Sequence, residues 1–220
     1  VLVGRRGEAL QQTLKDAGAQ GAHGHAMAAD VSDEAQVQAL FAQVKQRFGR
    51  LDLLFNNAGI SLPSLTPSQL SGSDWRRAVD VNLNGAFYCL AQAFKLMQEQ
   101  SPQGGRIINN GSISAYVPRP GSIAYTATKH AISGLTKAAS LDGRPYSIAV
   151  GQIDIGNVAS DMTERMAKGI VQADGSIRPE PRMDMSAVVE TFLTMSRMPL
   201  SANILFTTVM ATNMPYVGRG

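Results

Sequence analysis

The chain has 220 residues, of which 44% are apolar and 17% are charged, and it carries a formal net charge of +3. This balance excludes a disordered chain and fits one globular domain with a sizeable core. The basic residues are scattered, so we expect no nucleic-acid surface, and no apolar run approaches the roughly 20 residues of a membrane-spanning helix.

The single cysteine, Cys89, excludes an internal disulfide. It falls within a helical apolar pattern, so we expect a buried core thiol rather than a reactive one. No signal peptide is visible, and we therefore expect a cytoplasmic protein.

Strand-like and helix-like stretches alternate along the chain, a pattern typical of a parallel sheet covered by helices on both faces. In chain order, we expect a strand at residues 1–3, a helix at 8–17, a strand at 26–29, a helix between 33 and 49, and a strand at 51–55. A long helix is expected to begin at Asp74, followed by a strand at 106–109 and a helix from Tyr125 to residue 140. Further strands are expected at 147–150 and 204–209. The sequence thus predicts one doubly wound α/β domain over residues 1–220.

Residues 160–185 differ in character from the rest, and we call them the lid segment. They contain four methionines among glycines and prolines, and eight of the chain's ten methionines fall between 162 and 214. Unbranched thioether side chains adapt to irregular apolar shapes. This composition suits a mobile substrate lid, a gap-filling core or a subunit contact.

The clearest chemical signal is the pair Tyr125 and Lys129, which stand four residues apart within a predicted helix. Positions i and i+4 share one face, so the phenol and the ammonium point the same way. A fixed positive charge stabilises phenolate and lowers its pKa towards the working range of an acid–base catalyst. Ser112 lies 13 positions upstream of the tyrosine, and its hydroxyl could hydrogen-bond a substrate oxygen.

Two further features accompany this pair in the expected order. Asn56-Asn57-Ala58-Gly59 follows an apolar run, and Asn82 sits in Val81-Asn82-Leu83-Asn84-Gly85. With these motifs the chain resembles the short-chain dehydrogenase/reductase family over nearly all of its length. The resemblance implies a Rossmann-like three-layer α/β/α fold, a hydride transfer between a nicotinamide cofactor and a small-molecule carbonyl or secondary alcohol, and a substrate lid at the lid segment.

The resemblance also assigns roles to four catalytic residues. Tyr125 would be the acid–base, and Lys129 would lower the pKa of its phenol and hydrogen-bond the nicotinamide ribose. Ser112 would hold the substrate oxygen. Asn82 would fix a water that links the lysine to solvent.

For the cofactor, the resemblance implies an acid and its neighbour at the adenine, small residues where the chain passes close, and a glycine and a hydroxyl at the nicotinamide. In that order these positions are Asp30 and Val31, then Asn57, Ala58 and Gly59, then Gly156 and Ser160, with Tyr125 and Lys129 beside the nicotinamide. Two places depart from the family's usual wording. Asn109-Asn110-Gly111-Ser112 replaces a more usual apolar-Ser-Ser, and Ile155-Gly156 replaces Pro-Gly.

Arg5 and Arg6 follow the first predicted strand, where the adenosine ribose would lie. Two guanidiniums without a neighbouring carboxylate suit a 2′-phosphate, so we expect NADP rather than NAD. Solvated turn arginines are the alternative, as a helix-capping carboxylate is for Asp30. The three histidines, His23, His25 and His130, have no acidic cluster beside them, and we expect no metal site.

The family begins one β-α unit earlier, with a Gly-x-x-x-Gly-x-Gly turn that this sequence lacks, so we expect that this first unit is absent from it. If the unit were truly lost, a cofactor-free binding or structural protein would be the alternative; a non-redox epimerase or dehydratase is another. We also expect a homotetramer or homodimer, because the predicted catalytic helix presents small residues that allow close helix approach and strand 204–209 is apolar. The segment 214–220 is expected to lie against another subunit.

Overall fold

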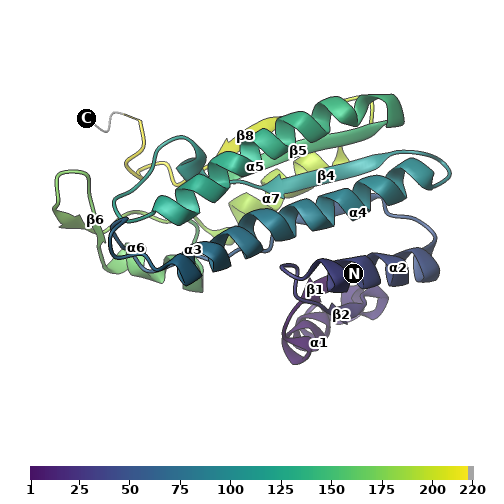
Figure 1. Cartoon of the computed structure of the whole chain (residues 1–220), viewed down its shortest axis with the longest axis horizontal. Coiled ribbons are helices and arrows are strands. Elements are labelled where there is room, and N and C mark those ends of the chain that lie inside the picture. Colours follow the sequence, from purple (N-terminus) through teal and green to yellow (C-terminus); the bar gives the residue numbers. More distant parts are fainter. Residues whose placement is uncertain (218–220) are drawn as a thin grey trace.

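The computed structural model describes residues 1–217, apart from the side chain of residue 161 (Figure 1). Residues 218–220, the tip of the segment expected at a subunit contact, lie outside this range. Four parallel strands form the main sheet in the order β3-β4-β5-β8. They are β3 (Leu53–Asn56), β4 (Gly105–Asn110), β5 (Ile148–Ile155) and β8 (Phe206–Val209). The predicted doubly wound α/β fold is confirmed.

A second, two-stranded parallel sheet is formed by β1 (Leu2–Gly4) and β2 (Ala26–Ala28). Within the described residues β1 pairs only with β2, and β3 pairs only with β4, so the two sheets are not joined by a shared strand. Strand β1 therefore forms one edge of the small sheet and β3 one edge of the main sheet, and neither edge is paired within the described residues.

Helices cover both faces of the main sheet. Figure 1 shows α4 and α5 lying side by side along one face, with α7 behind the strands. The helices are α1 (Gly7–Asp16), α2 (Glu34–Phe48), α3 (Gly72–Val79), α4 (Gly85–Glu99), α5 (Ile123–Asp142), α6 (Glu164–Lys168) and α7 (Met185–Arg197). None of the helices in the described part of the chain is long and apolar enough to cross a membrane.

The core divides into two layers because successive strand residues face opposite sides of the sheet. Ile107 and Val150 pack among helix residues of α2 and α4, including the buried Cys89. Ile108 and Ile153 pack on the other face against α7. The expected burial of Cys89 is confirmed, and burial raises the pKa of its thiol to about 11.

The helix boundaries follow from local capping. Asp33 accepts a hydrogen bond from the backbone N–H of Gln36 at the start of α2, and Gly49 ends that helix with φ 72°. Ser71 caps α3, because its Oγ accepts a hydrogen bond from the backbone N–H of Asp74. This helix therefore begins at Gly72 rather than at Asp74 as expected.

The long helix expected from Asp74 is interrupted. A π-helical turn, η2 (Asp80–Asn84), separates α3 from α4, which restarts at Gly85. Within α4, Met97 is fully buried whereas Phe87 is 49% exposed. One extra residue in a turn rotates the following helix and changes which side chains face the sheet.

Strand β5 is longer than the sequence pattern indicated. It continues from Ile148 to Ile155 instead of ending at residue 150, and the polar residues Gln152 and Asp154 are fully buried within it. The lid segment contains a 3-10 turn (Asp161–Thr163), α6, and a short hairpin of β6 (Ile170–Val171) and β7 (Ile177–Arg178).

Candidate active site

Helix α5 carries Tyr125 in its first turn and Lys129 one turn later. The Lys129 ammonium lies 5.5 Å from the centroid of the Tyr125 ring, so the two side chains share one face as the spacing predicted. The lysine is buried, while the tyrosine is partly exposed on the side that lines a cavity.

Lys129 is held by the end of strand β4. Its Nζ donates a hydrogen bond of 2.7 Å to the backbone carbonyl of Asn110. Burial lowers the pKa of Lys129 to about 8, and the negative charge of Asp154 opposes that fall. An ammonium has three N–H donors, and this is the one hydrogen bond that it makes within the described residues, so two donors remain for hydroxyl groups of a ligand.

Ser112 follows β4 directly and is buried. Its Oγ accepts a hydrogen bond of 3.1 Å from the backbone N–H of Ser114, which caps the short turn Ile113–Ala115. A hydrogen bond with Ser112 lowers the pKa of the Tyr125 phenol, but burial raises this pKa more strongly. The lowering by Lys129 that the family resemblance implies stays a prediction.

Asn82 lies in the π-helical turn, against the loop that follows β3. Its Oδ1 accepts from the N–H of Ile60 at 2.7 Å, and its Nδ2 donates to the carbonyl of Ile60 at 3.0 Å. Nδ2 also approaches Thr128 Oγ1 on α5 at 3.3 Å. The Asn82 side chain thus ties the loop after β3 to α5, and its role in holding a water stays a prediction.

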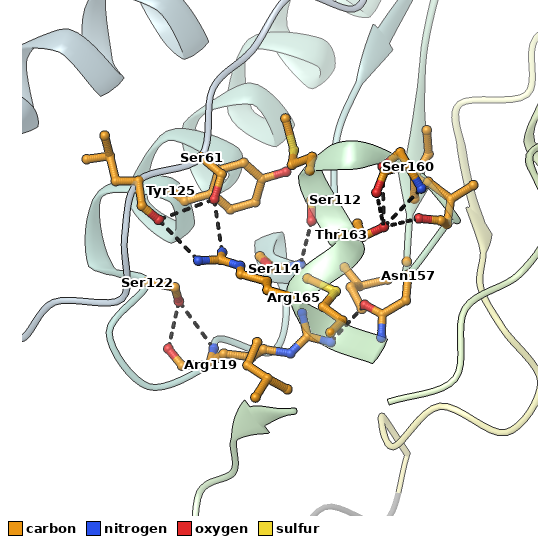
Figure 2. Close-up of a pocket in the computed structure, with 18 of the residues that line it drawn as sticks. Ser61, Ser112, Ser114, Arg119, Ser122, Tyr125, Asn157, Ser160, Thr163 and Arg165 are labelled. Atoms are coloured by element: carbon orange, nitrogen blue, oxygen red, sulfur yellow. Dashed lines mark hydrogen bonds between the residues drawn. The ribbon is translucent and has the colours of Figure 1, made fainter. Parts of the chain in front are cut away.

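Ser112 and Tyr125 open into a cavity of about 700 Å³. Figure 2 shows both side chains pointing into this space, with Arg165 of α6 reaching across it towards Ser61. Arg165 donates hydrogen bonds to Ser61 Oγ at 3.1 Å and to the Leu62 carbonyl at 3.5 Å. Most of the wall is apolar; its apolar residues include Phe55, Leu62, Leu65, Met162, Met166, Val189 and Phe192.

A buried ion pair, which was not predicted from the sequence, lies at one side of the cavity. Arg119 pairs with Glu180, and both bind Asn157, whose Oδ1 accepts from Arg119 at 3.0 Å and whose Nδ2 donates to Glu180 at 2.8 Å. These bonds tie the loop after β4 to the lid segment. No local pattern could have identified them, because the partners are far apart in the chain.

The carboxyl ends of the strands bring together several predicted cofactor residues. Asn57 and Ala58 follow β3, and Asn57 Oδ1 accepts from Asn110 Nδ2 at 2.7 Å. A Cβ at Gly59 would lie 3.4 Å from Asn82 Oδ1, so the chain is closely packed there. Asn57, Gly156 and Ser160 line the same cavity as Tyr125.

Gly156 follows β5, and its N–H donates to the Val209 carbonyl at 2.8 Å. A Cβ on it would lie 2.8 Å from Met210 Cβ, so glycine is required by the approach of the chain after β8. Ser160 hydrogen-bonds Thr163, whose Oγ also contacts the Val158 carbonyl. The lid segment therefore begins with a hydrogen-bonded turn.

The remaining residues predicted to bind the cofactor lie at the two-stranded sheet. Arg5 Nη1 is 3.9 Å from Asp30 Oδ2, and the Arg5 side chain is 69% exposed, as expected of a group available to a ligand. Asp30 Oδ1 accepts from the N–H and hydroxyl of Ser32, which lowers the pKa of the carboxyl; Asp33, not Asp30, caps the following helix.

Val31 packs against Gly85, where a Cβ would lie 2.9 Å from the Val31 side chain. Arg6 precedes α1. These residues lie at the carboxyl ends of β1 and β2, the edge at which such sheets bind ligands.

Across the described part of the chain, no three His, Cys, Asp or Glu side chains come together as metal ligands would. The ring of His25 contacts that of Phe48 in a tilted arrangement with centroids 5.3 Å apart, and the ring of His130 hydrogen-bonds the Thr126 carbonyl on its own helix. The side chains that surround Tyr125 can supply proton transfer and hydrogen bonding.

Comparison with known proteins identifies the family to which this chain is similar. A family model described as short chain dehydrogenase covers residues 1–170. The chain is 39% identical over 173 residues to a 3beta-hydroxysteroid dehydrogenase of Mediterraneibacter gnavus, covering 77% of this chain and 60% of that protein. It is 35% identical over 162 residues to the 3-oxoacyl-[acyl-carrier-protein] reductase FabG of Staphylococcus aureus, covering 74% and 63%. The chain thus spans less than two thirds of the length of these relatives.

Solved structures show the same architecture. The closed form of a serine dehydrogenase complexed with NADP+ superimposes with a TM-score of 0.84 at 25% identity, covering 99% of this chain and 87% of that one. ElxO with NADP bound superimposes with a TM-score of 0.81 at 25% identity, covering 94% and 85%.

Proposed function

The chain belongs to the short-chain dehydrogenase/reductase family, and we propose that it transfers a hydride between NADP and a carbonyl or secondary alcohol, with Tyr125 as the acid–base. The observation that carries the proposal is that Tyr125 and Ser112 line one cavity while the buried ammonium of Lys129 lies 5.5 Å from the centroid of the Tyr125 ring. The three residues come from two successive turns of α5 and from the end of β4.

Several residues fit a nicotinamide cofactor at this site. A nicotinamide cofactor, when bound, supplies or accepts the hydride at the substrate carbon. Lys129 retains two N–H donors for its ribose hydroxyls, and Gly156, Ser160 and Asn57 line the adjoining wall. Arg5 and Arg6, with Asp30 and Val31, would bind the adenosine end.

The proton steps follow from the positions of the side chains. In reduction, Tyr125 donates its phenolic proton to the carbonyl oxygen as the carbon gains the hydride, which yields the alcohol. In oxidation, the Tyr125 phenolate takes the hydroxyl proton while the carbon loses its hydride. Ser112 hydrogen-bonds the same oxygen in both directions, and Lys129 stabilises the phenolate electrostatically.

The substrate class follows from the cavity walls. Ser112 and Tyr125 supply polar groups to the cavity, whereas Leu62, Leu65, Met162 and Phe192 supply apolar surface. We therefore propose an apolar substrate with one carbonyl or secondary hydroxyl group, held under the lid segment. The names of two relatives, a hydroxysteroid dehydrogenase and an oxoacyl reductase, support a substrate of this type.

Preference for NADP over NAD rests on Arg5 and Arg6, since the nearest carboxylate, Asp30, already accepts from Ser32. A complex of a solved neighbour with NADP+ supports this assignment. The free thiol of Cys89 is compatible with the cytoplasm, where we propose that the protein works.

We also propose that a further β-α unit completes the cofactor site. The unpaired edges of β1 and β3 leave room in the hydrogen-bonding pattern for one more parallel strand, and the expected glycine-rich phosphate turn would follow it. Intact mass of the protein tests this point: about 3 kDa above 23.4 kDa, from roughly 30 extra residues, is the expected value.

The activity is tested with a small panel of substrates. Oxidation of NADPH or NADH is followed with a 3-oxosteroid and a 3-oxoacyl thioester, and the reverse reaction with the corresponding alcohols. We expect turnover of at least one substrate and a fall of at least about 10²-fold in Tyr125→Phe. Tyr146→Phe is the control, because Tyr146 packs against Phe94 in the core. No turnover with any pair, or normal turnover in Tyr125→Phe, would contradict the proposal.

A further inference from the structure

A buried carboxylate, that of Asp154, contacts the backbone of the proposed catalytic residue Ser112. Asp154, on β5, has no exposed surface. Its Oδ1 accepts hydrogen bonds from the Ser112 N–H at 2.9 Å and from Gln152 Nε2 at 2.7 Å, and its Oδ2 accepts from the Tyr116 hydroxyl at 3.0 Å. A fully buried carboxylate is costly unless its hydrogen-bonding capacity is used, and here three donors use it.

Asp154 acts on the proposed catalytic residues in two ways. The bond to the Ser112 N–H fixes the backbone that carries the serine hydroxyl. The negative charge also reaches the pair on α5, because Asp154 raises the pKa of Lys129 and of Tyr125. It thereby favours the ammonium on Lys129 over the neutral amine, although Lys129 is buried.

Gly111, the residue before Ser112, leaves room for this carboxylate because it has no side chain. A Cβ at Gly111 would lie 2.0 Å from Asp154 Oδ1 and 2.5 Å from Gln152 Nε2. No side chain fits at position 111 while Asp154 holds its present place. Gly111 and Asp154 are therefore structurally coupled, and both are within one residue of departures from the family's usual wording.

We propose that Asp154 is a positioning residue of this active site, which fixes the Ser112 backbone and maintains a negative charge behind Tyr125 and Lys129. This inference rests on the proposed function, since it assigns Asp154 a part in the same proton transfer. The strand paired with β5 at this point, β8, carries no titratable side chain. The titratable groups that interact with Asp154 come from the loop after β4, from α5 and from the C-terminal segment, and they are Tyr116, Tyr125, Lys129 and Tyr216.

The test is Asp154→Asn, which keeps the size and the acceptor for the Ser112 N–H but removes the charge. Removal of a negative charge lowers the pKa of both Tyr125 and Lys129. The pH midpoint of kcat should therefore move to lower pH by about one unit, in either reaction direction. Tyr116→Phe is the control, because it deletes one hydrogen bond to Asp154 and leaves the charge in place; its pH midpoint should stay at the wild-type value.

A second measurement separates this inference from the proposed activity. Nuclear magnetic resonance of isotope-labelled lysine follows the titration of Lys129 without any substrate, with Lys129→Arg identifying the signal. We expect the Lys129 midpoint to fall in Asp154→Asn and to stay unchanged in Tyr116→Phe. An unchanged midpoint in Asp154→Asn would overturn the inference even if the enzyme is active, whereas a shifted midpoint supports it even if no substrate is turned over.

If Asp154→Asn does not fold, the wild-type protein still decides the matter. The labelled carboxyl carbon of Asp154, assigned through the backbone, reports directly whether the group is ionised. A charged carboxylate at pH 7 supports the inference. A protonated Asp154 at that pH overturns it, because a neutral acid places no charge behind Tyr125.

Discussion

Arg165 offers the sharpest test of the lid segment. Its guanidinium extends from α6 across the mouth of the cavity to Ser61 and Leu62, and these contacts join the lid segment to the loop after β3. Arg165→Ala removes both contacts without touching Tyr125, Lys129 or the cofactor residues. If closure of the lid segment over the substrate is part of binding, this variant should bind substrate more weakly while its chemical step is unchanged.

The magnitude follows from the two distances. The bond to Ser61 Oγ at 3.1 Å has ordinary length, whereas the bond to the Leu62 carbonyl at 3.5 Å is at the limit of a hydrogen bond. A hydrogen bond to a charged group contributes more than a neutral one, but Arg165 is exposed and solvent reduces the gain, so about 1 kcal/mol is expected for the pair. This corresponds to a rise in KM of roughly fivefold.

Steady-state kinetics on the best substrate of the panel gives KM and kcat separately. Lys168→Ala is the matched control, since Lys168 lies on the same helix and its ammonium pairs within that helix with Glu164 at 2.7 Å. We expect KM to rise in Arg165→Ala, to stay at the wild-type value in Lys168→Ala, and kcat to change in neither. Equal KM values in the two variants would show that the Arg165 contacts do not hold a binding-competent lid.

Three further outcomes are expected. Arg5→Ala combined with Arg6→Ala should weaken NADP at least about tenfold and leave NAD little changed, measured by fluorescence titration; an equal loss for both cofactors contradicts 2′-phosphate recognition. Light scattering at micromolar concentration should give four chain masses, or two, because α5 presents Gly134 to open space and β8 is an edge strand; a monomer refutes this. Asn82→Ala should lower the free energy of unfolding by about 1–3 kcal/mol in urea, since it strips two hydrogen bonds from the Ile60 backbone. Asn84→Ala is the control, because within the described residues its side-chain amide bonds only Asp80 on the same turn, and an equal loss in both variants would contradict the reasoning.

Local rules predicted those parts of the fold that local interactions determine. The i, i+4 spacing predicted that Tyr125 and Lys129 share a face of α5, and Gly49 ends α2 in the left-handed conformation expected of it. The π-helical turn at Asp80–Asn84 was not predicted, because apolar residues continue at nearly helical spacing through it. What stabilises that turn is tertiary: Asn82 hydrogen-bonds a loop 22 residues away.

The extent of β5 was underestimated for a related reason. Gln152 and Asp154 interrupt the apolar pattern, and polar residues ordinarily indicate the end of a buried strand. In the structure, Gln152 Oε1 accepts from Thr136 at 2.9 Å and its Nε2 donates to Ser133 at 3.0 Å, both on α5. Asn109 of β4 donates to the same Thr136. Such a network satisfies every member only when the helix and both strands are already packed, so no single segment of sequence reveals it.

The two departures from the family's wording illustrate how such segments depend on each other. Taken separately, Gly111 in place of a polar residue and the altered turn after Asp154 each weaken the match to the family. In the structure Gly111 meets the residue that precedes the altered turn, since the space left by the missing side chain at Gly111 is the space into which Asp154 Oδ1 projects. A serine at position 111 would exclude the carboxylate, and a smaller residue at position 154 would leave the Ser112 N–H without its buried acceptor. Glycine at position 111 and the carboxylate at position 154 therefore constrain each other, and together they form one structural arrangement beneath the Ser112 backbone.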